Sequence, residues 1–193
     1  MHKYLILVMG FIIAISPHVL RGAKALIETP KATKNIYEQQ YQMGLFLKRY
    51  YQGKVVAAND IGAINYLADI RCLDLWGLAD IEVGRAKYKK LYNKSMIEKI
   101  AYNRGVEIAI VYDNWFASSE IGGLPSSWKQ AGQWKILENV ICGGDIVSFY
   151  AVDTTKTQEL IYNLQSFSNE LPADVIQMVG VPVQPCPRAG GDR

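Results

Sequence analysis

Three aspartates end or interrupt short apolar runs, and this spacing is the feature of the chain best suited to chemistry. They are Asp60, Asp74 and Asp113. Apolar runs of this length are typical of buried strands, and α/β folds bind their ligands outside the carboxyl ends of parallel strands. We therefore expect the three carboxylates to lie along one rim of a sheet.

Three neighbours suggest what such a rim could bind: Asn59, Trp76 and Trp115. Tryptophan rings pack on the apolar face of a sugar while carboxylates accept hydrogen bonds from its hydroxyls, and carboxylates also hold hard divalent cations. A purely structural interpretation is also open and is the stronger of the two. Asp60 would cap the short helix that follows it, Asp74 would cap a turn, and the tryptophans would cover the core.

Other catalytic signatures are absent from the sequence. It contains no phosphate-binding loop, no dinucleotide fingerprint and no nucleophile elbow. Its two histidines, His2 and His18, both lie in the N-terminal segment, which excludes a histidine-based triad in the soluble part. We predict no catalytic residue, no metal site and no cofactor. The net charge of +3 is too small to indicate nucleic-acid binding.

The N-terminal segment predicts a membrane anchor. Residues 4–20 contain no acidic or basic residue apart from His18, and a helix of this length nearly spans a bilayer. A cleaved signal peptide is the alternative, although Arg21 and Lys24 directly after the run favour an uncleaved anchor over residues 1–21. The same charges, taken alone, would place the following domain in the cytoplasm.

The rest of the chain predicts an α/β domain. We expect a three-layer sandwich whose mostly parallel sheet ends in an antiparallel hairpin, preceded by one transmembrane helix. Thr33 is expected to cap the first helix of the domain. The predicted segments are a linker (22–33), a soluble domain (34–171) with a first helix (34–51), strands (54–59, 71–75, 106–112), a hairpin (134–140 and 147–152) and a last helix (154–171), and a loosely ordered tail (172–193).

Two motifs carry a resemblance to a known family. They are Asn59-Asp60-Ile61-Gly62-Ala63-Ile64-x-Tyr66 and Leu73-Asp74-Leu75-Trp76-Gly77-Leu78-Ala79-Asp80. Their order resembles the C-terminal extracytoplasmic domain of polytopic membrane glycosyltransferases of the GT-C type, the protein mannosyltransferase and aminoarabinose transferase group. The similarity runs over residues 37–150.

The resemblance implies a location and partners. The apolar segment would correspond to the last transmembrane helix of such a transferase, in the bacterial cytoplasmic membrane, with the soluble domain extracytoplasmic. This side of the membrane is opposite to the one that the flanking charges favour. The implied partners are the membrane, a polytopic glycosyltransferase subunit, a glycan or a polyprenyl-phosphate-sugar. The catalytic carboxylate of these transferases lies in an early loop that has no counterpart here.

We therefore expect an accessory domain that does not transfer a sugar by itself, present either as a truncated C-terminal piece or as a free-standing tethered domain. Two alternatives remain. One is a metal-dependent hydrolase or other enzyme that uses Asp60, Asp74 and Asp113. The other is a structural remnant with no ligand.

Overall fold

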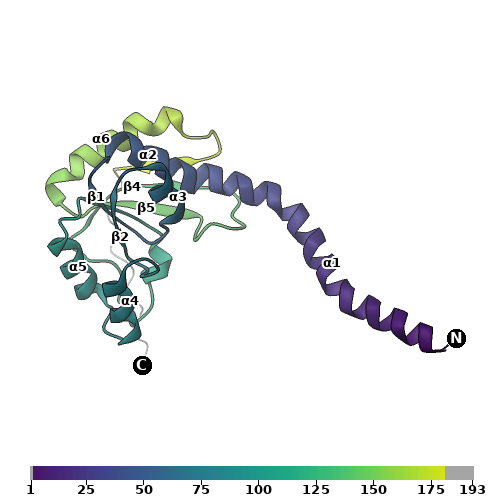
Figure 1. The fold of residues 1–193 in the computed structure, drawn as a ribbon. Coiled ribbons are helices and arrows are strands. Elements are labelled where there is room, and N and C mark those ends of the chain that lie inside the picture. The colour runs from purple at the N-terminus through teal and green to yellow at the C-terminus, as the bar shows by residue number, and fades with distance from the viewer. Residues whose placement is uncertain (1, 181–193) are drawn as a thin grey trace, which may run out of the picture.

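The computed structural model describes residues 2–180, in which a six-stranded mixed sheet lies between two helical layers (Figure 1). The strands lie in the order β2-β1-β3-β5-β4-β6. Their bounds are β1 (Val55–Ala58), β2 (Arg71–Asp74), β3 (Ile108–Val111), β4 (Lys129–Lys135), β5 (Ile146–Ala151) and β6 (Ile176–Val179). The helices are α1 (His2–Ile36), the π-helix η1 (Tyr37–Tyr41), α2 (Gln42–Tyr50), α3 (Gly62–Leu67), α4 (Ile81–Tyr88), α5 (Lys94–Asn103) and α6 (Thr157–Phe167), with 3-10 turns η2 (Asp113–Phe116), η3 (Thr154–Lys156) and η4 (Ser168–Glu170).

The sheet is only partly parallel. β1 pairs in parallel with β2 and β3, as the helical connections between them predict. An antiparallel hairpin is present as β4 and β5, but β4 begins at Lys129 and shares only residues 134 and 135 with the predicted strand 134–140. β5 also pairs antiparallel with β3, and β4 with β6. Three of the five pairings are therefore antiparallel, so the prediction of a mostly parallel sheet was wrong.

The start of the predicted tail is also ordered structure. Residues Ile176–Val179 form the edge strand β6, and Gly180 N–H donates to the carbonyl of Ala131 at 2.8 Å. The prolines of the predicted tail, Pro182 onward, suggested disorder for the whole segment. They follow this strand and lie outside the described residues, as does the rest of 181–193.

Two hydrophobic layers hold the sheet. On one face α2, α3 and α6 pack around Phe46, which is fully buried and lies 5.5 to 5.7 Å from the rings of Trp134, Phe149 and Phe167. On the other face α4 and α5 cover the strands. β1 and β3 are buried along their whole length, which explains why their sequences are continuous apolar runs.

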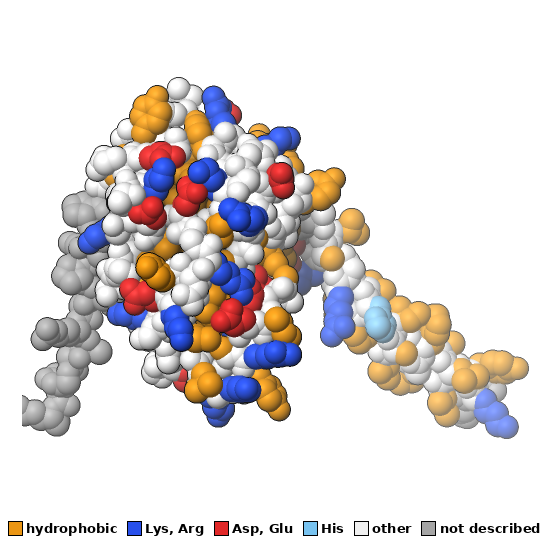
Figure 2. Space-filling view, turned by 60° about the vertical axis from the view of Figure 1, so that its left-hand side comes forward, with side chains coloured by type: hydrophobic (Ala, Val, Ile, Leu, Met, Phe, Trp, Pro, Cys, Tyr) orange, Lys and Arg blue, Asp and Glu red, His pale blue; other side chains and the backbone are white. Residues whose placement is uncertain are grey.

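One uninterrupted helical segment, Lys3–Tyr50, joins the apolar N-terminus to the domain (Figures 1 and 2). Among the described residues, this is the helix that is long and apolar enough to cross a membrane. Its most apolar stretch of 18 residues is not buried against the rest of the protein. A single-pass anchor and a signal sequence both fit this finding.

The predicted linker is helical. Residues 22–33 belong to α1, which contains Pro30. Thr33 does not cap a new helix, because its hydroxyl donates to the carbonyl of Thr29 at 2.9 Å within α1. An interior proline costs a helix one hydrogen bond but does not have to end it.

The Phe46 cluster generates a stability prediction. Phe46→Ala should lower the free energy of unfolding by about 3–5 kcal/mol, because it removes a buried ring and leaves a cavity among three aromatic neighbours. Urea unfolding of the detergent-solubilised chain measures this. Tyr102→Ala, at a tyrosine that is 83% exposed, is the matched control and should change the value by less than about 0.5 kcal/mol. Equal effects of the two changes would contradict the packing described.

Candidate functional site

The carboxyl ends of β1 and β3 mark the point where the sheet's connections diverge. The chain leaves β1 through α3 on one face and reaches β3 through α4 and α5 on the other. In open α/β sheets such a switch point opens the crevice in which ligands bind. The predicted site residues at this crevice are Asn59, Asp60 and Asp113.

In this protein the crevice is filled by the chain itself. The Asn59 side chain is buried, and its Oδ1 accepts a hydrogen bond from the backbone N–H of Tyr112 at 3.0 Å, which links the two strand ends. Its Nδ2 is buried and has no hydrogen-bond partner within residues 2–180. Asn59 therefore joins β1 to β3 and is not open to a ligand.

Two glutamines of the π-helix fill the rest of the crevice. The Tyr112 hydroxyl donates to Gln39 Oε1 at 2.8 Å. Gln40 Nε2 donates to Tyr112 Oη at 3.2 Å and to Asp60 Oδ2 at 3.1 Å. The Cys142 thiol, whose pKa burial raises to about 11, donates to Gln40 Oε1 at 3.1 Å. We call Gln39, Gln40, Asp60, Tyr112 and Cys142 the junction cluster, because it fixes the N-terminal helix to the sheet.

The hydrogen bond to Gln40 corrects the predicted role of Asp60. The residue at the N-cap position of α3 is Ile61, and α3 has no side-chain cap. Asp60 instead accepts from Gln40. A capping residue and a residue that binds a preceding helix look alike in sequence, since both are aspartates at the end of a strand.

Asp74 caps a turn, which is the structural one of the two roles that the sequence left open for it. Its carboxylate is buried and accepts from the backbone N–H groups of Trp76 at 2.8 Å and Ala79 at 2.7 Å. These bonds hold the turn between β2 and α4. Gly77 in the same turn has φ of +79°, and a Cβ there would lie 2.8 Å from the backbone nitrogen of Gly84 in α4. The turn is thus packed directly on α4.

Asp113 is half-buried and bonded within the sheet. It accepts from the hydroxyls of Ser148 at 2.5 Å and Tyr150 at 2.9 Å, and Gln133 Nε2 donates to Ser148 Oγ at 2.9 Å. Burial raises the pKa of the Asp113 carboxyl, and the two hydroxyl bonds offset only part of that effect. The two residues that donate to Asp113 come from β5, which the sequence did not connect with the site.

The three aspartates therefore do not share one open crevice. Each accepts hydrogen bonds from its own neighbours: a helix glutamine, a turn backbone or two β5 hydroxyls. Among residues 2–180 no three His, Cys, Asp or Glu side chains are grouped closely enough to hold a metal ion. The arrangement gives these carboxylates positioning roles.

The two predicted tryptophans do come together. The rings of Trp76 and Trp115 meet edge to face with centroids 4.8 Å apart, and the Trp115 indole N–H donates to the carbonyl of Gly143 at 2.9 Å. They line an open hollow of about 460 Å³, which we call the tryptophan hollow. Its lining residues are Trp76, Lys87, Lys90, Tyr92, Trp115, Ser118, Glu120 and Ile121.

Lys87 is the residue of this hollow that sequence reasoning missed most clearly. Its Nζ lies 3.2 Å from the centroid of the Trp76 ring and donates to the Trp76 carbonyl at 3.1 Å. Burial lowers the pKa of the Lys87 ammonium. In the sequence Lys87 stands among several lysines of a polar helix, and only the close packing of Gly77 on Gly84 brings that helix to Trp76.

Together these features define a mixed α/β domain carried on a long apolar helix, with its switch-point crevice filled and an aromatic hollow beside it. The family model for a domain of unknown function (DUF8728) matches residues 34–150, more than half of the chain, and the protein belongs to that family. The matched region includes the junction cluster and the tryptophan hollow. No curated protein and no solved structure matches the chain.

The buried environment of Asp113 generates a pH prediction. In the folded state the Asp113 carboxyl keeps its proton to a higher pH than in the unfolded state, where its pKa is about 3.9. Stability from this group is therefore greatest below about pH 4 and falls as pH rises through the higher folded pKa. Asparagine resembles the protonated acid and does not titrate, so the stability of Asp113→Asn should not show this decrease with pH.

Thermal unfolding of both proteins between about pH 4 and pH 8 measures the effect. The difference in stability, wild type minus Asp113→Asn, should decrease with pH and then level off. A difference that grows as pH rises would mean that Asp113 is stabilised as the carboxylate. Asp69→Asn, at an exposed aspartate, controls for the change of charge.

Proposed function

We propose that this protein is a membrane-tethered, non-catalytic domain that assists glycosyl transfer. It is related to membrane glycosyltransferases of the GT-C type and lies in the bacterial cytoplasmic membrane with its domain extracytoplasmic. It binds a glycan acceptor, a lipid-linked sugar donor or a partner subunit. The observation that carries the proposal is the tryptophan hollow, an open aromatic site beside carboxylates that are already hydrogen-bonded.

The geometry supports a binding role over a catalytic one. The face of a tryptophan ring suits the apolar face of a sugar ring. Glu120 and Ser118, which also line the hollow, offer acceptors and a donor for hydroxyl groups. The long apolar helix supports a tether, because it continues without a break into the domain.

The alternative, a hydrolase or metal-dependent enzyme using Asp60, Asp74 and Asp113, has weaker support. General acid–base catalysis needs a carboxyl group within hydrogen-bond reach of the substrate. Asp74 is buried in a turn and Asp60 is bonded to Gln40. Asp113 has a raised pKa, as a general acid would, but its hydrogen bonds to Ser148 and Tyr150 point to a role within the sheet.

Trp76→Ala tests the proposed sugar site. The full chain in lipid nanodiscs should bind an oligosaccharide or a lipid-linked sugar, and removing this ring should weaken binding by about two- to tenfold, since ring stacking contributes about 0.5–1.5 kcal/mol beyond area burial. Isothermal titration calorimetry measures the affinity, and a thermal melt checks folding. Tyr66→Ala, at an exposed tyrosine of α3, should leave binding unchanged. Absence of any sugar binding by the wild type at millimolar ligand would overturn the proposal.

A further inference from the structure

The outer surface of α4 combines basic and large apolar side chains. Arg85, Lys89 and Lys90 are exposed, and no carboxylate of the described residues forms a salt bridge with them. The exposed large apolar side chains on and beside α4 are Leu78, Ile81, Tyr88 and Leu91. We call these seven residues the α4 surface, and Figure 2 shows basic and apolar side chains side by side at the lower end of the domain, where α4 lies in Figure 1. Basic residues beside exposed apolar ones are typical of helices that lie on a membrane surface.

The spacing along α4 places the two kinds of side chain together. Ile81, Arg85 and Tyr88 follow one another at intervals of four and three residues, so they share one face of the helix. The buried residues of α4 are Val83 and Ala86, which pack in the core. The domain therefore uses a different face of α4 for its own packing, and a tyrosine that is 90% exposed is left on the outer face.

The positive charge of the α4 surface is only partly offset by its neighbours. Asp80 and Glu82, at the start of α4, are both paired with Arg104. Glu120 is the one carboxylate that lines the adjacent tryptophan hollow, beside Lys90. An anionic bilayer attracts each lysine or arginine held within about 10 Å of it, so several such residues together favour a membrane as the partner.

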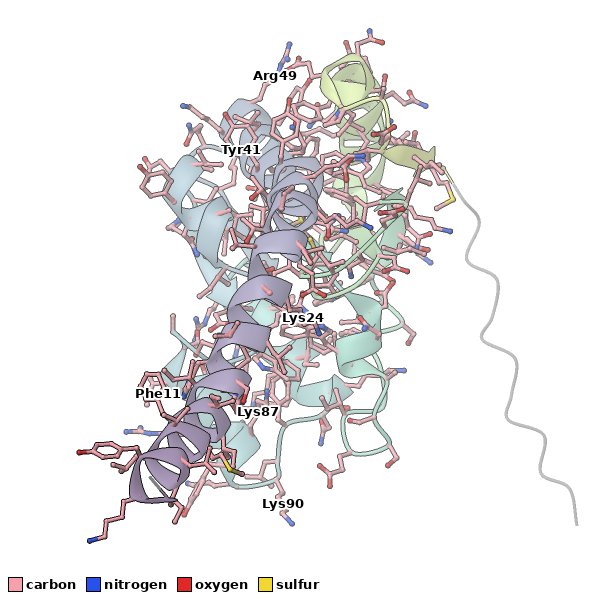
Figure 3. All side chains as sticks on the ribbon, turned by 90° about the vertical axis from the view of Figure 1, so that its right-hand side faces the viewer. Phe11, Lys24, Tyr41, Arg49, Lys87 and Lys90 are labelled. Carbon is pink, nitrogen blue, oxygen red and sulfur yellow. The ribbon has the colours of Figure 1, made fainter. Side chains whose placement is uncertain are left out.

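The α4 surface lies at the end of the domain that a membrane around α1 can reach. Figure 3 shows Lys90 at the end toward which the Phe11 half of α1 projects, whereas Arg49 lies at the opposite end. Pro30 lies in α1 between the apolar run and the domain, and prolines are the usual places at which a helix bends. A bend or a tilt of α1 therefore brings α4, and not the opposite end of the domain, to the bilayer surface.

We propose that the α4 surface docks the domain onto anionic lipid headgroups of the same membrane that holds α1. Arg85, Lys89 and Lys90 bind the lipid phosphates, while Tyr88 and Leu91 rest at the boundary between the headgroups and the acyl chains. This inference goes beyond the proposed function, since it rests on the anchor but not on a sugar site. A bilayer fits the surface better than an acidic protein does, because exposed apolar side chains accompany the charges and α1 holds the bilayer next to the domain.

Hydrogen–deuterium exchange of the full chain tests the docking in two kinds of nanodisc. One kind contains phosphatidylcholine alone, and the other contains equal parts of phosphatidylcholine and phosphatidylglycerol. Amides of residues 78–91 should exchange at least about threefold more slowly in the anionic discs, because docking opposes the local opening that exchange requires. Amides of β1 should exchange equally in both. In about 1 M salt, where the Debye length is about 3 Å, the difference between the discs should disappear.

A triple variant tests the basic residues. Each lysine or arginine near an anionic surface strengthens binding by about fivefold, so replacing Arg85, Lys89 and Lys90 by glutamine should abolish the slower exchange in anionic discs. The matched control removes the same charge from three exposed lysines elsewhere, Lys48, Lys129 and Lys135. The control should keep the slower exchange. An equal loss in both variants would show that only the net charge of the chain acts, and the inference fails.

Tyr88→Ser tests the apolar part of the contact. Because the Tyr88 side chain is exposed, its loss should leave the melting temperature unchanged while reducing the difference between the two kinds of disc. Tyr102→Ser, at an exposed tyrosine of α5, should leave that difference as it is in the wild type. Equal behaviour of the two variants would overturn the placement of Tyr88 in the membrane surface.

The outcomes separate this inference from the proposed function. If the chain does not insert into nanodiscs, the anchor is wrong and the docking with it. If the chain inserts but residues 78–91 exchange equally in both kinds of disc, the docking alone is wrong, and the α4 surface is left for a protein partner. Calorimetry with sugars tests the tryptophan hollow separately, and its result does not depend on the exchange of α4.

Discussion

The packing of the π-helix against the carboxyl ends of β1 and β3 is the contact on which the rest of the structure depends. Residues Glu38, Gln39 and Gln40 are consecutive and all buried, which the wider turn of a π-helix permits and one face of an α-helix does not. A buried amide without partners costs about 1–3 kcal/mol. Gln39 and Gln40 have hydrogen-bond partners only in this position of the helix. The partners are Tyr112, Asp60 and the backbone carbonyls of Gly144 and Asp145. The junction cluster therefore fixes both the rotation and the depth of the helix.

The same position of the π-helix also attaches the end of α1 to the segment that connects β4 and β5. The Asn35 side chain donates to the carbonyl of Glu138 and accepts from the N–H of Val140, so it pairs with that segment as a neighbouring strand would. Lys34 reaches Asp174 at 2.7 Å beside β6. The long apolar helix therefore continues without a break into a segment that is hydrogen-bonded to the domain (Figure 1). The crevice in which α/β sheets usually bind ligands is filled as a result, whereas the adjacent tryptophan hollow is open.

Much of the fold could be predicted from the sequence, because buried parallel strands and a Gly-rich hairpin leave strong local patterns. The antiparallel half of the sheet could not, since no local pattern tells whether β5 will lie beside β3. Trp76 and Trp115 were correctly expected at one edge. Lys87 and Gln40 were not, because both look like ordinary exposed helix residues. The π-helix decides the position of Gln40, and the close contact of Gly77 with Gly84 decides that of Lys87.

Hydrogen–deuterium exchange of the full chain in nanodiscs tests most directly whether the helix is built into the domain. We expect the amides of residues 37–50 to exchange as slowly as those of β1, because they would open only with the whole domain. Residues 37–50 that exchange within seconds while β1 stays protected would show a hinged tether, and would contradict the claim that this helix fills the crevice.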